Sequence, residues 1–362
     1  MTPRSDRPAP LSVAAAVPPC AVAQVAARAS ARAAALVATR AALLAATLAL
    51  SPAASAAESA RQWLDSMSDA MQSLNYEGTF VYIHGGDIES MRIVHSRDES
   101  GENERLVSLN GEAREIIRDD SEVVCIWPGS KSVIISKSRP RTPFPSLVQK
   151  LDLGGLDDVY HFALAGDDRV AGMIAKVVEI RPRDALRYGY RLWIDRDSRL
   201  LLRSDLLDVA GEPVEQLMFT EIRLLDAVPS ERFRPLLQGA GYTWQREGEL
   251  VPVSRQSRPR WHFASLPPGF MQMSESLRPM GSSGKTVHHV ILSDGLASVS
   301  VYIEPRSGDK PNIKRLFGSS QMGGMHAYGL GRDGLHVTAV GEVPLATVRA
   351  VGEAVRPGPA RD

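Results

Sequence analysis

Residues 188–207 read YGYRLWIDRDSRLLLRSDLL, and this stretch decides the fold class. Two apolar runs, each the length of a strand, flank a polar segment from Asp195 to Arg199. This pattern is typical of a β-hairpin, in which a polar turn joins two antiparallel strands. Asp195 and Asp197 also suggest a calcium loop, but the glycine and the distal glutamate of such a loop are missing. A turn is therefore the favoured interpretation.

The same strand pattern continues toward the N-terminus of this hairpin. Gly85-Gly86 and Asn110-Gly111 tolerate the positive φ angles of tight turns, so strands adjacent in sequence should pair antiparallel. We expect eleven strands in one strongly curved sheet, which makes the protein β-rich. The expected strands span residues 78–84, 91–95, 105–109, 112–118, 123–127, 133–136, 160–164, 171–180, 188–194, 200–207 and 214–221.

An amphipathic helix is expected at 57–74, before the first strand. Trp63, Leu64, Met67 and Met71 recur there at helical three-and-four spacing. Such a stripe covers a sheet or, as an alternative, grips a ligand; covering the sheet is favoured. The strand pattern is broken by a segment with Pro140, Pro143 and Pro145 around Phe144, and this segment is interpreted as a lid.

A strongly curved sheet must cover its concave face with helices, loops or a guest molecule, and this geometry raises ligand binding as a hypothesis. Aromatic residues on or between the curved strands are the candidates for the wall of an apolar cavity. The alternative for each is ordinary core packing. These residues are Phe80, Tyr82, Trp127, Phe144, Tyr160, Phe162 and Trp193.

The first 56 residues resemble an export signal. They contain Asp6 as their single acidic residue, and an apolar run at 41–50 leads to Ala54-Ser55-Ala56. The small-x-small pattern predicts cleavage after Ala56 and a periplasmic mature protein. A retained membrane anchor is the alternative, but ten apolar residues fall short of the roughly 20 that span a bilayer.

The mature chain is mildly acidic and has one cysteine. The whole chain of 362 residues has 42 basic and 42 acidic residues; the signal takes five and one of these, which leaves 37 and 41. This balance argues against nucleic-acid binding. Cys20 is removed with the signal, so a disulfide within the mature chain is excluded. Cys125 is expected to be a small buried hydrophobic residue, with a reactive thiol as the alternative.

A second, smaller α+β domain is expected at 259–362, after a first domain at 57–238 and a polar, glycine-containing linker at 239–258. A hairpin around Asp294-Gly295 forms its centre. The expected strands are 286–292, 297–304, 325–328 and 335–340, and the expected helix, which Pro344 precedes, is 345–355.

Three motifs approach known chemistry and fail. Gly284-Lys285-Thr286 lacks the upstream glycine of a phosphate loop, because Pro279 stands there. Gly318 to Met322 lacks the second glycine of a hydrolase elbow. The adjacent histidines His288 and His289 lie on a strand, point to opposite faces and do not readily share a metal ion. The sequence therefore nominates no catalytic residue, metal ligand or cofactor, and a non-enzymatic protein is expected.

Several segments together resemble the RseB/MucB family of periplasmic regulators of the envelope-stress sigma factor. The matching segments are SLNYEGTF at 73–80, NGEAREIIR at 110–118, residues 188–207, LPPGF at 266–270, LSDGL at 292–296 and VGEVP at 340–344. They follow in order over essentially the whole mature chain. One departure is Asn110-Gly111-Glu112, where the family pattern has Asp-Gly-Pro, and both forms satisfy a tight turn.

The resemblance implies a first domain shaped like the LolA-type lipoprotein carriers, an unclosed β-barrel, and a smaller second domain. It further implies a negative regulator that binds the periplasmic region of a transmembrane anti-sigma factor of the RseA/MucA type. The regulator shields this partner from the site-one protease until a lipid or lipopolysaccharide signal releases it. Whether the protein forms a homo-oligomer stays open.

We expect the partner to contact the second domain and the end of the linker. The candidate residues are Arg255, Arg258, Arg260, Trp261, Phe263, Phe270 and Tyr302. A periplasmic lipid or lipoprotein carrier is the alternative function, although a simple carrier has little use for a second folded domain. An exported hydrolase is a third alternative, for which the sequence shows no convergent nucleophile and base.

Overall fold

A computed structural model describes residues 58–99, 101–137, 155–236, 241–246, 251–252, 261–280, 285–305 and 315–358. The expected signal, its cleavage point and the expected lid around Phe144 lie outside these residues. In the described part of the chain, no helix is long and apolar enough to cross a membrane.

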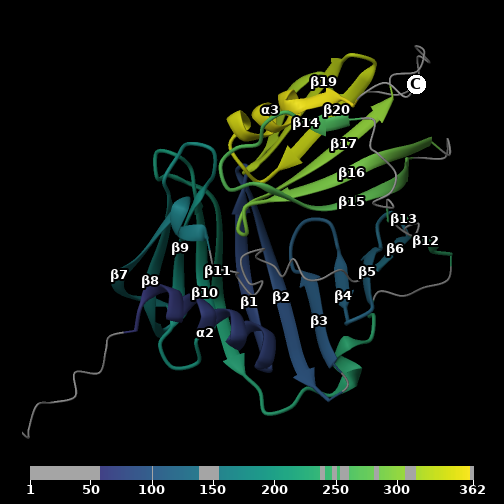
Figure 1. The fold of residues 1–362 in the computed structure, drawn as a ribbon. Coiled ribbons are helices and arrows are strands. Elements are labelled where there is room, and N and C mark those ends of the chain that lie inside the picture. Colours follow the sequence, from purple (N-terminus) through teal and green to yellow (C-terminus); the bar gives the residue numbers. More distant parts are fainter. Residues whose placement is uncertain are drawn as a thin grey trace, which may run out of the picture. The chain divides into compact units, whose positions relative to one another are not determined.

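The first sheet has twelve strands in the order β12-β6-β5-β4-β3-β2-β1-β11-β10-β9-β8-β7 (Figure 1). Neighbours pair antiparallel, except that β12 runs parallel to β6. The order does not return to its start, so the sheet is unclosed. Its strands are β1 (Tyr76–His84), β2 (Asp87–Asp98), β3 (Gly101–Ser108), β4 (Glu115–Arg118), β5 (Glu122–Trp127), β6 (Ser132–Lys137), β7 (Tyr160–Val170), β8 (Met173–Pro182), β9 (Gly189–Asp195), β10 (Leu201–Leu207), β11 (Pro213–Leu224) and β12 (Thr243–Arg246).

The expected fold class is confirmed, because all eleven expected strands of this sheet are present as β1 to β11 with shifted ends. The hairpin expected at residues 188–207 is formed by β9 and β10. In its turn the Asp195 carboxylate accepts hydrogen bonds from the backbone N–H of Ser198 (2.8 Å) and from its hydroxyl (2.7 Å). The aspartate therefore serves as a turn former. The described residues contain no cluster of three or more metal-ligating side chains.

Helix α2 (Ala60–Ser73) covers one face of this sheet, which we call the inner face (Figure 1). It begins with a capping box, in which the Ser59 hydroxyl accepts from the Gln62 N–H and the Gln62 side chain accepts from the Ser59 N–H. Leu64 and Met67 are fully buried. They pack in a core with Phe80 and Tyr160, so the apolar stripe of this helix covers the sheet.

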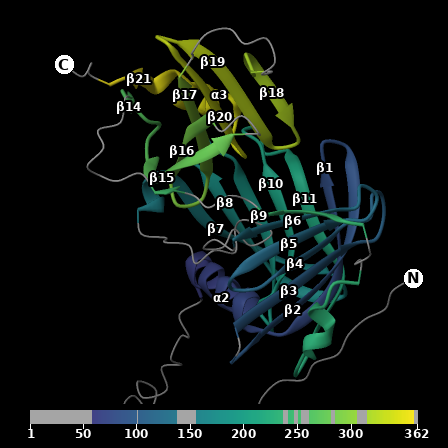
Figure 2. The same ribbon diagram turned by 90° about the vertical axis from the view of Figure 1, so that its right-hand side faces the viewer.

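The second sheet has seven strands in the order β13-β15-β16-β17-β20-β19-β18, and α3 (Leu345–Ala354) packs on it (Figure 2). Val290, Val301 and Val348 are fully buried in its core. Two further strands, β14 (Trp261–Phe263) and β21 (Val355–Pro357), pair with each other in a separate two-stranded sheet. The strands are β13 (Val251–Pro252), β14 (Trp261–Phe263), β15 (Met271–Met280), β16 (Lys285–Ser293), β17 (Ser298–Pro305), β18 (Gly318–Met322), β19 (Met325–Arg332), β20 (Leu335–Gly341) and β21 (Val355–Pro357). Two short 3-10 helices, η2 (Leu156–Asp158) and η3 (Ser230–Phe233), complete the described elements.

Several strands were not expected. The segment from Gly318 to Met322, which was compared with a hydrolase elbow and rejected, is β18, and it pairs regularly with β19. Strand β15 was also not expected from the sequence, although its first four residues alternate between apolar and polar; all four are exposed. Within the range expected to be a linker, β12 joins the first sheet and β13 joins the second. Short polar strands acquire their structure from a neighbour, and sequence patterns do not record that neighbour.

Candidate functional site

Four of the aromatic residues proposed to line a cavity meet on the inner face. Phe80 and Tyr160 are 1% and 0% exposed. Tyr82 and Phe162 are partly buried and pack against the same cluster. Because α2 inserts Leu64 and Met67 into this cluster, these positions are core, and the half of the inner face under α2 is filled by the protein's own side chains.

Of the other three candidates, Trp193 and Trp127 do not join this cluster. Trp193 lies in a separate core with Val177 and Leu202, and its indole N–H donates to Asp168 at 2.8 Å. The expectation that it faces the same hollow as Phe80 is therefore wrong; neighbouring residues on a strand alternate between faces, and Trp193 lies between Leu192 and Ile194 of the inner core. Trp127 is half-buried on β5. Phe144 lies outside the described residues.

Beyond α2, the inner face continues over β4, β5 and β6. The register places Ile116 opposite Cys125, and Cys125 opposite Ile134. Ile116 packs against the inner core, so this row belongs to the inner face. Its three residues are only half-buried. An apolar surface is therefore accessible here, and Cys125 is less buried than the sequence predicted.

A polar hollow of about 290 Å³ opens on the opposite, outer face over β1, β2 and β11. It forms because Gly78 and Thr79 are short and their neighbours are long. Hydrogen bonds from Arg223, and then from Arg232, hold the pKa of Glu77 below its usual value. The hollow contains none of the predicted cavity residues. Its lining is Glu77, Gly78, Thr79, Arg92, Glu221, Arg223 and Arg232.

Among the described residues proposed for partner contact, two are buried in the second domain and two are partly buried. Trp261 and Phe270 are 3% and 5% exposed and belong to its core, so they are unavailable at the surface in this conformation. Phe263 packs against that core. Tyr302 is half-buried and stacks on His289 with 4.6 Å between ring centroids. Arg255, Arg258 and Arg260 lie outside the described residues.

A buried ion pair joins the two domains, and sequence reasoning missed it. Arg187, which follows β8, places its Nη1 2.7 Å from Oδ2 of Asp294 in the β16–β17 turn, and both side chains are 0% exposed. The Tyr160 hydroxyl donates to the same carboxylate oxygen at 3.1 Å. Arg187 also donates to the Pro268 carbonyl oxygen at 2.6 Å. The sequence marked Asp294 only as a turn residue.

The aspartate performs two tasks at once. Its second oxygen accepts from the backbone N–H groups of Leu296 (2.9 Å) and Ala297 (2.7 Å), and so closes the hairpin turn. The turn that gives the second sheet its central hairpin is thereby the element that docks on Arg187. Leu296, from the same turn, packs against the core of the first domain.

A second group of contacts joins the domains around a pair of carboxyl groups. Glu215 on β11 accepts from the Tyr82 hydroxyl and from the Gly324 backbone N–H, the latter at 2.8 Å. Glu342, which follows β20, hydrogen-bonds to Glu215 and Tyr190. Burial raises the pKa of Glu342 to about 8, and the charge of Glu215 acts in the same direction. Two carboxyl groups in hydrogen-bond contact require one proton between them.

Histidine and tyrosine side chains complete this junction. His326 Nδ1 lies 3.3 Å from the Tyr188 hydroxyl and 2.9 Å from the Val343 carbonyl oxygen. The Thr347 hydroxyl donates to the carbonyl oxygen of Leu186. Chemically, this arrangement holds two domains together and binds a proton; it presents no nucleophile activated by a base among the residues described here.

We predict that Asp294→Asn destabilises the protein by about 3 kcal/mol, because it leaves the buried Arg187 guanidinium with the partly exposed Asp184 as its one remaining counter-ion among the described residues. The amide oxygen retains the turn contacts, so the loss reports on the ion pair. Denaturant unfolding measures the change. Asp184→Asn is the matched control: Asp184 also accepts from Arg187 (3.1 Å), but its side chain is 30% exposed. Equal stability of the Asp294 variant and wild type would contradict the prediction.

We predict that stability falls by about 2 kcal/mol between about pH 6 and pH 9 because of Glu342. Its pKa is raised above the ordinary 4.5 in the folded protein. The stabilisation is thus complete below pH 4.5 and is lost as the pH rises through about 8. Tyr82 and Tyr190 stay protonated over this range, because burial raises their pKa values further above the usual 10.

Glu342→Gln is expected to remove this pH dependence, whereas the exposed Glu353→Gln serves as the control and should preserve it. Unfolding free energies of the three proteins, measured at matched ionic strength, decide the matter. An undiminished fall of stability in the Glu342 variant would assign the proton to another group.

Comparisons with known proteins agree on one family. Residues 59–237 match the model of the MucB/RseB N-terminal domain, and residues 255–356 match that of the C-terminal domain. Sigma factor AlgU regulatory protein MucB of Pseudomonas aeruginosa is 34% identical over 303 residues, covering 82% of this chain and 91% of that protein. Sigma-E factor regulatory protein RseB of Escherichia coli K12 is 29% identical over 311 residues, covering 82% and 91%.

Solved structures give the same result. The complex of Pseudomonas aeruginosa MucA and MucB contains a chain with 32% identity and a TM-score of 0.63, covering 83% of this chain and 99% of that chain. A second structure, MucB in complex with MucA(peri), has a TM-score of 0.62 at 29% identity, covering 83% and 100%. Two domain models in order, one relative above 30% identity and a shared fold leave no ambiguity: the chain belongs to the MucB/RseB family.

Proposed function

We propose that this protein binds the periplasmic region of a transmembrane anti-sigma factor and thereby regulates an envelope-stress sigma factor. The observation that carries the proposal is the MucA/MucB complex, whose MucB chain is 32% identical to this one over 83% of its length. Both the N-terminal and the C-terminal domain of the family are present in this chain, in order. The relatives named above are regulatory proteins by name, which supports a binding role and not an enzymatic one.

The proposed mechanism is protection of a protease substrate by a protein bound to it. A bound regulator covers the segment that the site-one protease must reach, so the anti-sigma factor stays intact while the complex persists. This requires both proteins to be in the periplasm, as the export signal predicts for this chain. Release then needs a signal that lowers the affinity of the complex.

A lipid or lipopolysaccharide acyl chain is our candidate for this signal, and the inner face of β4 to β6 is its candidate site. The half-buried row of Ile116, Cys125 and Ile134 supports this choice, because each methylene buried against it gains about 0.8 kcal/mol. The half of the inner face under α2 is filled. A release signal must favour a conformation that the partner binds poorly, since equal affinity for both states shifts nothing.

A lipid or lipoprotein carrier is the competing function. The buried Arg187–Asp294 pair argues against it, because this contact fixes a whole second domain on the first, and transport of a lipid gives no use for that domain. A carrier also needs a large apolar hollow, whereas the side chains of α2 fill half of the inner face.

We predict that the mature protein, residues 57–362, slows cleavage of a purified anti-sigma periplasmic fragment by the site-one protease by at least about tenfold. Binding is expected at micromolar affinity or better, which corresponds to about −8 kcal/mol. Gel-based cleavage rates with and without the protein provide the measurement. Unchanged cleavage, together with a loss of lipoproteins from the outer membrane after gene deletion, would favour the carrier.

We predict that lipopolysaccharide restores cleavage and that Ile134→Asn blunts this effect several-fold, because a polar amide on the inner face weakens burial of an acyl chain. Ile135→Asn is a matched control. It is the adjacent isoleucine, equally half-buried, and it points to the outer face because side chains alternate along β6. Equal responses of the two variants would place the lipid elsewhere.

A further inference from the structure

The two sheets have four edge strands, and three of them are protected against pairing with another chain. An unprotected edge exposes backbone N–H and C=O groups, and proteins guard it with charges, prolines, bulges or short strands. Strand β7 has a bulge after Leu164 and carries Asp167, Asp168 and Arg169. Strand β13 has two residues, one of them Pro252.

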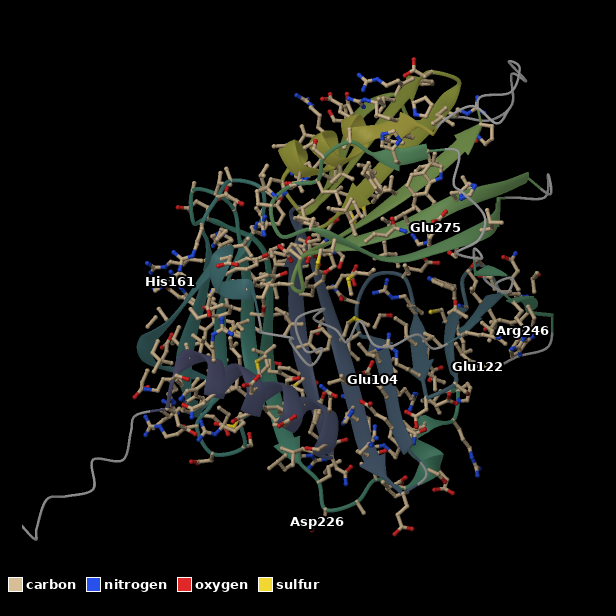
Figure 3. All side chains as sticks on the ribbon, in the orientation of Figure 1. Glu104, Glu122, His161, Asp226, Arg246 and Glu275 are labelled. Carbon is tan, nitrogen blue, oxygen red and sulfur yellow. The ribbon has the colours of Figure 1, made fainter. Side chains whose placement is uncertain are left out.

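The third protected edge is β12. This four-residue strand ends at Arg246, whose guanidinium pairs with Glu122 on β5 (Figure 3). This ion pair spans the neighbouring strand β6 and so keeps the charge of Arg246 at the edge of the sheet. A short strand with a fixed charge offers little to an approaching chain.

The fourth edge, β18, is also short, but it lacks the other three protections. Its sequence, Gly-Ser-Ser-Gln-Met at 318–322, contains no charge and no proline, and all five residues are exposed. It pairs with β19 in regular register, without a bulge. In the described part of the chain, no strand pairs with its outer side.

Apolar side chains flank this edge, and its far end is fixed in place. Phe317 is 59% exposed just before the strand, and Met322 is 70% exposed at its end. The Gly323-Gly324 turn that follows is bound to the first domain through the contact between Gly324 and Glu215. Gly323 has a φ of +57°, a backbone conformation that favours glycine, and a Cβ there would lie 2.9 Å from a Glu215 carboxylate oxygen.

We propose that the outer edge of β18 accepts an extended segment of the polypeptide partner, which adds a strand to the second sheet. In such β-augmentation, main-chain hydrogen bonds give affinity and side-chain contacts give specificity; Phe317 and Met322 would supply those contacts. The proposal deepens the proposed function and rests on it. It also ties the docking edge to the junction, since separation of the domains breaks the contact that anchors the β18–β19 turn.

A second copy of this chain is the less suitable occupant. Five residues span only about 17 Å, and two such strands paired with each other bury far less than the roughly 1,000 Å² that a stable dimer needs. A long, flexible partner segment does not have this limit, because it can continue onto other surfaces after the strand.

Hydrogen–deuterium exchange of the mature protein tests the proposal directly. On addition of the anti-sigma periplasmic fragment, we expect the amides of residues 318–322 to exchange at least about tenfold more slowly, because new ladder hydrogen bonds protect them. Ser320→Lys places a guarding charge on the edge and should weaken fragment binding about tenfold. Ser274→Lys is the matched control, an exposed serine on β15, near the opposite edge of the same sheet.

Each other outcome overturns the proposal in a distinguishable way. Fragment binding without protection at 318–322, and with Ser320→Lys equal to wild type, removes the edge site and leaves the proposed function intact. Failure of the wild-type protein to bind any fragment removes both. Protection that appears on raising the protein concentration alone, with a dimer in sedimentation, assigns the edge to a second copy.

Discussion

The buried contact between Arg187 and Asp294 is the interaction on which the two-domain structure depends. The Arg187 guanidinium has no solvent exposure, and two carboxylates, a carbonyl oxygen and two aromatic rings, those of Tyr160 and Phe270, surround it. Partial separation would break the contact with Asp294, and breaking a buried ion pair costs several kcal/mol. The junction is therefore expected to be either closed or open, with few intermediate states.

A junction with two discrete states is what a releasable regulator needs. A ligand shifts an equilibrium only by its difference in affinity for the two states. The Glu215–Glu342 pair adds a second constraint, because the closed state holds a proton that a separated pair would release. The junction and the β18 edge are directly connected, because Glu215 on β11 accepts a hydrogen bond from the Gly324 N–H in the turn after β18.

Local pattern predicted much of the fold. Strands β1 to β11 are visible in the sequence because their apolar residues alternate or form short runs. The apolar stripe of α2, at three-and-four spacing, likewise predicted a helix that covers a sheet. The candidate site was predicted less well. Trp193 and Phe80 look alike in sequence, yet one residue of offset on a strand sends them to opposite faces, and the bulges in β10 and β11 make that offset hard to count.

By itself the sequence determined the fold class, the family and the absence of any recognisable catalytic motif, because these depend on periodicity and on ordered short segments. Only the tertiary structure decided that Asp294 faces Arg187, 107 residues away along the chain, and that Glu342 shares a proton with Glu215. It also decided which edge strand stays open. These features depend on which groups are brought together out of water, and a linear pattern does not encode the distance between residues that are remote along the chain.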